Sequence, residues 1–195
     1  ALGKMARDVS LLMQDEVGEA AEPGGGSSTM PHKRNPAASA RVLAAATRLP
    51  GLVAAFLTGM VQEHERAVGG WHAEWPTIAA AVQTTGSALE AMAALAAGLS
   101  VDPDRMRANI EKTNGEIFAE RAMMILTPAL GKELASRLVS AALAQSRETG
   151  KSFREALTSA PDVAGVIPAD ELRTIDVPEN YLGVAETLRA RLLDR

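Results

Sequence analysis

The chain has 195 residues, a formal net charge of −4 at pH 7 and no cysteine, which excludes a disulfide scaffold and a thiolate nucleophile. Its three histidines show no metal-ligand spacing, its net charge argues against a general nucleic-acid binder, and no apolar run approaches the length that crosses a bilayer. We therefore expect a soluble, cytoplasmic protein with no metal and with neither a nucleic acid nor a membrane as partner.

Helical spacing dominates the chain, and no strand-like alternation persists. Residues 1–20 already have the pattern of a helix interior, with apolar residues on one helical face: Leu2, Met5, Val9, Leu12 and Met13.

Residues 23–36 combine several features of an anion-binding loop. The glycine run 24–26 gives the backbone freedom to move and to approach a ligand closely. Two adjacent serine hydroxyls follow, and Lys33 and Arg34 add fixed positive charge. The alternative is a Gly/Ser linker in front of a helix start that happens to be basic.

The end of this loop predicts the start of a helix. Asn35 followed by Pro36 is typical of an N-cap and a first helical residue, and the free N–H groups of such a helix end bind anions. No Asp or Glu occurs between Pro23 and Gln62, so the window is cationic although the whole chain is acidic.

Two long helices with narrow apolar seams are expected next. In residues 36–66 the apolar positions recur at steps of three and four, with a kink expected at Pro50-Gly51, and the seam consists of Val42, Ala46, Leu49, Val53, Phe56 and Met60. The second seam consists of Ile78, Val82, Thr85, Leu89, Met92, Ala96 and Leu99. Such seams favour packing against helices of other subunits, with a monomeric bundle as the alternative.

Shorter helices are expected after residue 100. Gly98 predicts a helix end and Asp102-Pro103 a new helix start, while Ser152 and Glu155 form a capping-box pattern. The expected helices span 103–112, 116–129, 132–147, 153–159 and 183–193. We thus predict an all-α fold, in which a bundle portion (1–100, with the 23–36 loop) precedes a small helical C-terminal domain (101–195).

Two stretches resemble a known superfamily. Residues 26–36, GSSTMPHKRNP, closely resemble the signature loop of the fumarase/aspartase superfamily. Residues 62–66 and 71–75 are similar to the bacterial carboxymuconate cycloisomerases. Adenylosuccinate lyases carry paired Ser and an Arg for a nucleotide phosphate where this chain has residues 71–75, and many lyases carry a Glu where it has Ala40. These departures favour a cycloisomerase over a lyase.

The resemblance implies a role for each matching residue. Ser27 matches the serine that acts as general acid or base, and Lys33 and Asn35 match positions that hold a substrate carboxylate. Ser28, Thr29 and Met30 would line the site, and Arg66 is a further candidate substrate contact. Mobility of the glycine run would let the loop close over substrate.

The implied reaction is the conversion of 3-carboxy-cis,cis-muconate, a small tricarboxylate, to 4-carboxymuconolactone in protocatechuate catabolism. One substrate carboxylate adds to a double bond and a proton reaches the neighbouring carbon, so that no metal or organic cofactor is needed. The resemblance also implies a homotetramer.

Several alternatives stay open. A fumarate-releasing lyase has the same fold, and a non-catalytic helical oligomerisation module with an idle anion site is a different class of protein. His64, Arg66 and His72 could bind carboxylates or form only a polar helix-end cluster, and His32 could be a surface residue. Because superfamily subunits are longer, we expect a C-terminal fragment that is inactive alone.

Overall fold

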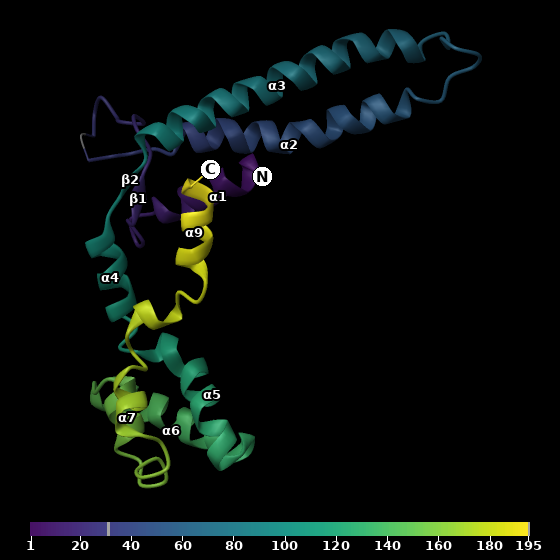
Figure 1. The fold of residues 1–195 in the computed structure, drawn as a ribbon. Coiled ribbons are helices and arrows are strands. Elements are labelled where there is room, and N and C mark those ends of the chain that lie inside the picture. The colour runs from purple at the N-terminus through teal and green to yellow at the C-terminus, as the bar shows by residue number, and fades with distance from the viewer. Residues whose placement is uncertain (31, 195) are drawn as a thin grey trace. The chain divides into compact units, whose positions relative to one another are not determined.

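The computed structural model describes residues 1–30 and 32–194, and its regular secondary structure is almost wholly helical (Figure 1). The predicted all-α fold is confirmed, with one pair of two-residue strands as its exception. The chain divides into two compact units, Ala1–Met106 and a unit that begins at Arg107. Helix α4 (Pro103–Glu111) crosses this division, and its residue Arg105 donates from Nε to the carbonyl of Val17 at 2.8 Å.

The first unit is built around a hairpin of two long antiparallel helices, which lie side by side in Figure 1. Strands β1 and β2 pair antiparallel, with Ala20 opposite Val101. The elements are α1 (Leu2–Leu12), β1 (Ala20–Ala21), α2 (Ala37–Thr58), α3 (Gly70–Gly98) and β2 (Ser100–Val101).

The core of the first unit lies at one end of this hairpin. There α1 packs against the first turns of α2 and the last turns of α3, and the buried side chains are Ala6, Val9, Ala38, Val42, Ala91, Met92 and Leu95. Alanines on α2 and α3 allow these helices to approach each other closely. The apolar periodicity predicted that the two helices would pack along apolar seams. This core supports the end of the hairpin from which the 23–36 loop emerges.

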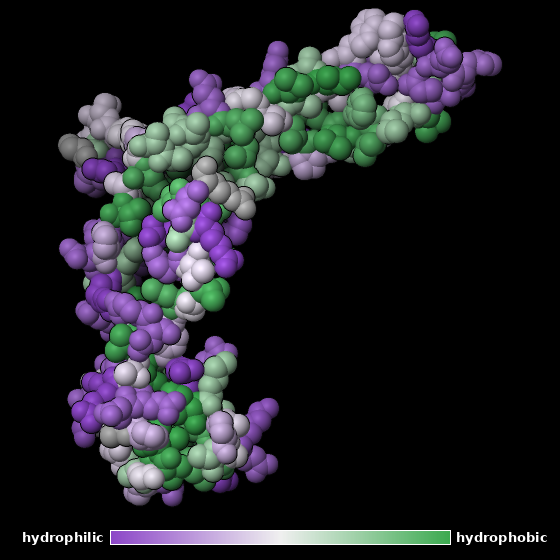
Figure 2. All heavy atoms as spheres, in the orientation of Figure 1, coloured by the Kyte–Doolittle hydropathy of each residue, from purple (hydrophilic) through white to green (hydrophobic). Residues whose placement is uncertain are grey.

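The rest of the hairpin keeps apolar side chains at its surface (Figure 2). Leu57 is 55% exposed and Val82 66% exposed. Among the described helices, α2 alone is long and apolar enough to cross a membrane, judged by length and composition only. The expectation that no apolar run reaches this length is therefore wrong for α2. The same composition is typical of a helix that other helices surround in a soluble bundle.

Several predicted helix ends differ from the structure. Helix α1 ends at Leu12 instead of continuing to residue 20, and α2 ends at Thr58 instead of reaching residue 66. Met13, just after α1, packs against the core, whereas Met60 and Val61, just after α2, are 61% and 82% exposed, so apolar residues at helical spacing do not by themselves extend a helix. The predicted end at Gly98 and the N-cap at Asp102 are confirmed, and Asp102 accepts the N–H of Arg105 at 2.9 Å.

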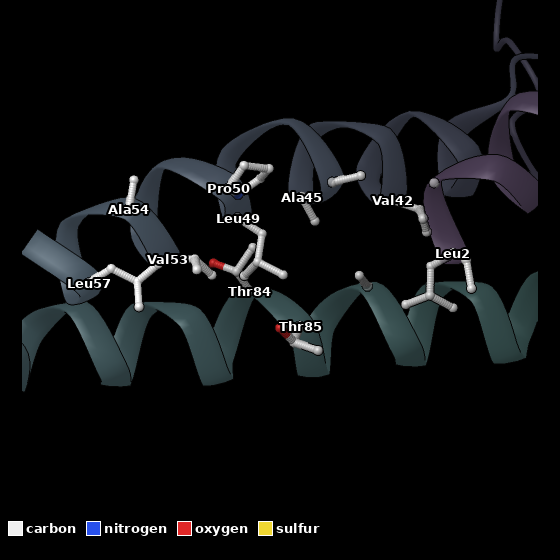
Figure 3. A pocket seen from close by; sticks show the side chains of 14 residues that line it. Leu2, Val42, Ala45, Leu49, Pro50, Val53, Ala54, Leu57, Thr84 and Thr85 are labelled. Carbon is white, nitrogen blue, oxygen red and sulfur yellow. The ribbon is translucent and has the colours of Figure 1, made fainter.

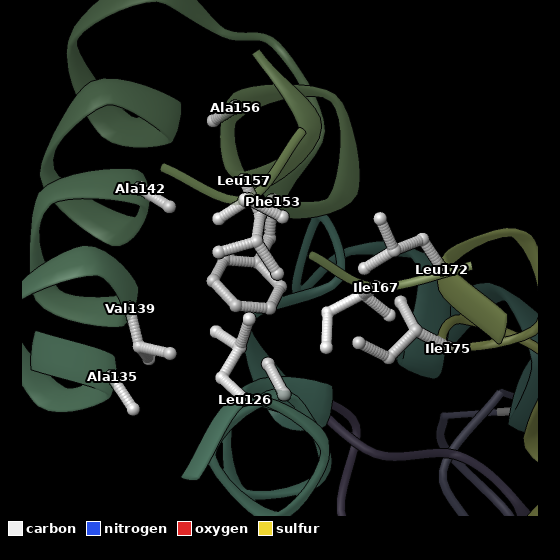
Figure 4. Close-up of a cluster of buried hydrophobic side chains, with 12 residues drawn as sticks. Leu126, Ala135, Val139, Ala142, Phe153, Ala156, Leu157, Ile167, Leu172 and Ile175 are labelled. Atoms are coloured by element: carbon white, nitrogen blue, oxygen red, sulfur yellow. The ribbon is translucent and has the colours of Figure 1, made fainter. Parts of the chain in front are cut away.

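The second unit contains short helices around its own core (Figure 4). Phe153 and Leu157 of α7 are buried against Leu126 of α5 and Val139 of α6. The capping box of Ser152 and Glu155 is confirmed. The elements after α4 are η1 (Glu116–Phe118), α5 (Ala119–Leu130), α6 (Lys132–Thr149), α7 (Phe153–Thr158), α8 (Ala169–Arg173), η2 (Pro178–Tyr181) and α9 (Ala185–Leu193).

Candidate functional site

The 23–36 loop is closed at its base by its own backbone. Asn35 donates to the carbonyl of Gly25 twice, from its backbone N–H at 2.9 Å and from Nδ2 at 3.0 Å. Gly26 and Arg34 form an antiparallel bridge beside this contact. This closure holds the described residues between Gly26 and Arg34 together as one lobe. Pro31 lies outside the described residues.

Asn35 therefore has a different role from the one that its sequence context predicts. Helix α2 begins at Ala37, its N-cap is Pro36, and no side chain caps it locally. The prediction of Asn35 as N-cap and Pro36 as first helical residue is wrong, because the Asn35 amide is used to close the loop.

The start of α2 is capped by Glu22, an acid that the sequence analysis missed. The Glu22 carboxylate is buried and accepts the N–H of Ala38 at 2.6 Å and the N–H of Ser39 at 3.0 Å. It also accepts the hydroxyl of Ser39 at 2.9 Å. These two backbone donors of the helix end are therefore already engaged by the protein's own carboxylate. The one available signal was that Glu22 is the last acid before the acid-free window.

Ser27 lies half-buried within the lobe, and its hydroxyl oxygen faces two donors. Ser27 Oγ accepts the backbone N–H of Met30 at 3.1 Å and that of Thr29 at 3.3 Å. Hydrogen bonds donated to an oxygen favour its charged form over its neutral form. The local turn thus supplies stabilisation for negative charge on Ser27 Oγ, and a serine needs such help to accept a proton.

The cations of the loop border a polar cavity of about 510 Å³. Lys33 and Arg34 line it together with Glu22 and loop glycines, and Gly98 and Ser100 form part of its wall. Both cationic residues are exposed, as are Ser28, Thr29 and Met30. An anionic group that enters this cavity meets the two positive charges of Lys33 and Arg34, whose attraction solvent screens in part because both residues are exposed.

Arg66 lies at the opposite end of the hairpin from this loop. Its guanidinium carbon is 5.3 Å from the centre of the Trp71 ring, which packs edge-on against Trp75 at 4.9 Å. Helix α2, with 22 residues, separates the two sites by roughly 33 Å at the usual rise of a helix. His64, near Arg66, has a positive φ of 57°. One copy of the chain does not bring Arg66 next to Ser27.

An apolar groove of about 590 Å³ runs along the hairpin (Figure 3). Leu49, Val53 and Leu57 of α2 line it opposite Thr84 and Thr85 of α3, and Leu2 of α1 lies at one end. Because Val53 and Leu57 in this groove are 47% and 55% exposed, the groove is a candidate interaction surface.

Comparisons with known proteins agree with this description. A family model described as "Lyase" matches residues 1–51, and one described as "Adenylosuccinate lyase C-terminus" matches residues 115–192. These matches and the all-α fold place the chain in the fumarase/aspartase superfamily.

Within this superfamily the chain is similar to 3-carboxy-cis,cis-muconate cycloisomerases. The protein of that name from Bradyrhizobium diazoefficiens is 43% identical over 98% of this chain and 44% of its own length. The crystal structure of 3-carboxy-cis,cis-muconate lactonizing enzyme from Pseudomonas putida superimposes with a TM-score of 0.83 at 40% identity, over 97% of this chain and 42% of that one. Nitrosuccinate lyase from Streptomyces davaonensis is 42% identical over 96% of this chain and 40% of its length. The chain therefore spans less than half the length of these relatives.

Proposed function

We propose that the full-length protein containing this chain is a cytoplasmic cycloisomerase that converts 3-carboxy-cis,cis-muconate to 4-carboxymuconolactone in aromatic catabolism. The observation that carries the proposal is the similarity to cycloisomerases along nearly the whole chain, the 23–36 loop included. The cations beside the loop suit a tricarboxylate substrate, because their charges complement it.

The proposed reaction needs a proton transfer and stabilisation of developing charge. A carboxylate oxygen of the substrate adds to a double bond, and the adjacent carbon takes up one proton. Charge develops on the carboxylate next to that carbon as it becomes enolate-like, and Lys33 is the candidate to stabilise it. Ser27 is the candidate proton carrier, since the N–H groups of Thr29 and Met30 stabilise its oxyanion. Because the nucleophile belongs to the substrate, these steps require no organic cofactor.

We also propose that the active protein is a homo-oligomer, in line with the tetramer that the sequence analysis expected. The apolar groove of the hairpin and the exposed side chains beside it favour burial against further copies. Within one copy, about one helix length separates Arg66 from Ser27, so Arg66 cannot reach the site of its own copy. In an assembly, Arg66 of one copy would instead complete the site around Ser27 of another. Residues 1–195 alone would then retain the loop without full activity.

A second candidate is a lyase that releases fumarate from a substituted succinate. The 42% identity to nitrosuccinate lyase supports it, because this value is almost the same as that to the cycloisomerases. Both candidates use an anionic substrate and a proton transfer at carbon, so the loop geometry suits either one.

The test measures turnover by the full-length protein, as wild type and as Ser27→Ala. We expect wild type to remove the diene ultraviolet absorbance of 3-carboxy-cis,cis-muconate. We expect Ser27→Ala to lower kcat by about 10² to 10⁴-fold with little change in substrate binding, as typical for loss of a general acid or base.

Parallel assays with nitrosuccinate, adenylosuccinate and argininosuccinate separate the candidates by fumarate release. Turnover of one of these, with no loss of the muconate diene, would replace the cycloisomerase by a lyase. Diene loss that Ser27→Ala leaves unchanged would keep the cycloisomerase and transfer the proton step to another residue.

A further inference from the structure

One buried carboxylate connects the entrance and the exit of the 23–36 loop. Glu22 is the last residue before the loop, and its side chain is 2% exposed. Its three hydrogen-bond donors belong to Ala38 and Ser39, which follow the loop directly in the first turn of α2. A single side chain thus fixes both ends of the loop to one point.

The surroundings of Glu22 explain why the carboxylate stays in place. Burying a carboxylate is unfavourable unless hydrogen bonds and positive potential compensate for the lost water. Here three donors satisfy its oxygens, and the positive end of the α2 dipole adds favourable potential. Engaged in this way, the group serves as a fixed anchor.

The backbone that follows the anchor turns at two glycines. Pro23 is held against α3, because a Cβ at Gly98 would approach Pro23 Cγ to 2.7 Å. The next two residues, Gly24 and Gly25, have φ angles of +81° and +70°, a region that glycine adopts readily. The fixed base therefore extends from Pro23 to Gly25, whose carbonyl accepts two hydrogen bonds from Asn35, and the lobe that carries Ser27 begins beyond it.

We propose that Glu22 is a positioning residue, whose buried carboxylate holds the base of the 23–36 loop so that Ser27 and Lys33 reach their working positions. This inference rests on the proposed function of the loop as a proton-transfer site. In Glu22→Gln one of the two carboxylate oxygens becomes an NH₂ donor, so one of the N–H groups of residues 38 and 39 loses its acceptor and the first turn of α2 loosens. The remainder of α2 stays packed through Val42 and the core of the first unit.

The first test is amide hydrogen exchange of the chain as wild type, Glu22→Gln and the matched control Glu90→Gln, which alters an exposed carboxylate of α3. We expect Glu22→Gln to accelerate exchange at least tenfold at residues 38 and 39 and also at Met30 and Asn35 of the loop. The core amide of Leu95 should keep its protection, and the control should match wild type. Unchanged exchange at Met30 and Asn35 would overturn the proposal, because Glu22 would then stabilise only the helix end.

The second test separates positioning from helix stability by kinetics of the full-length protein on 3-carboxy-cis,cis-muconate. We expect Glu22→Gln to lower kcat at least tenfold and to change KM less. Adding Ala37→Asp restores an acid at the start of α2 without tying residue 22 to it, so Tm should recover while kcat stays low. Recovery of kcat together with Tm would contradict a positioning role. Wild type without turnover would refute the proposed function, and the exchange experiment would still decide on Glu22.

Discussion

Gly25 is the residue on which closure of the 23–36 loop depends most directly. Its φ is +70°, and a Cβ on it would lie 2.0 Å from the carbonyl oxygen of Asn35. The neighbouring glycines differ in an informative way. Gly24 has a φ of +81° with open space around it, and Gly26 has open space without a positive φ. Substitutions at these three consecutive glycines can therefore separate the effect of backbone strain from the effect of the contact with Asn35.

We expect Gly25→Ala to open the loop and to destabilise the chain more than either neighbour. Gly24→Ala should destabilise by about 1–2 kcal/mol through backbone strain alone, and Gly26→Ala should be close to wild type. Gly25→Ala adds a steric clash to the same strain, so its amide exchange at Asn35 should also rise. Thermal unfolding and exchange of the three variants measure this order. Equal effects of Gly24→Ala and Gly25→Ala would mean that the contact with Asn35 is unimportant.

Between elements of the second unit, Glu116 of η1 and Arg147 of α6 form a bidentate pair, with both N···O distances at 2.8 Å. The hydrogen bond from Arg147 lowers the pKa of the Glu116 carboxyl below its ordinary value of 4.5. A carboxyl whose pKa is lower in the folded than in the unfolded state stabilises the fold above the unfolded pKa. That stabilisation is lost as the pH falls through the lowered value. The ion pair thus stabilises the packing of η1 against α6 at neutral pH, and this stabilisation is lost in acid.

We expect Glu116→Gln to lower Tm slightly at pH 7, since exposed ion pairs contribute little. The difference from wild type should shrink as the pH falls below 4.5 and through the lowered pKa of the Glu116 carboxyl. Thermal unfolding at several pH values measures it, with Glu148→Gln at an exposed carboxylate of α6 as control. If the Tm of Glu116→Gln stayed equally far below that of wild type in acid, the charge of the carboxylate would not be the source of the difference.

For the whole molecule, the central question is what covers the apolar side chains of the hairpin. Helix α2 is apolar enough to pass a length and composition test for a membrane helix, yet little of it is buried within this chain. A groove lined by Leu49, Val53 and Leu57 runs beside it. The proposed burial of this surface against other copies would account for the apolar composition of α2.

Introducing a charge into the groove should weaken the proposed assembly. In the full-length protein we expect Leu57→Glu, at a groove residue that is 55% exposed, to shift the mass measured by light scattering towards smaller species. Leu192→Glu, at a 72% exposed residue of α9, is the control and should leave the mass unchanged. A Leu57→Glu protein with the wild-type mass would remove the groove from the interface.

The sequence by itself predicted the features that depend on neighbouring residues. The two long helices follow from a local apolar periodicity, and the cap at Asp102 and the capping box at Ser152 involve residues only three positions apart. Ser27 and Lys33 were recognisable as candidates because the loop motif is contiguous, and their roles stay predictions. Such patterns act within one or two turns of chain, where the sequence contains both partners.

Only the tertiary structure decided which distant groups meet. Glu22 caps α2 from 16 residues away, and Asn35 closes the loop on Gly25 instead of capping the helix. Neither hydrogen bond can be predicted from neighbouring residues, because the backbone path of the loop determines which acceptor reaches which donor. The separation of Arg66 from Ser27 likewise appeared once α2 was seen as one continuous helix between two ends. Hydrogen bonds and charges act over a few ångströms of space, and the fold alone determines which residues come that near.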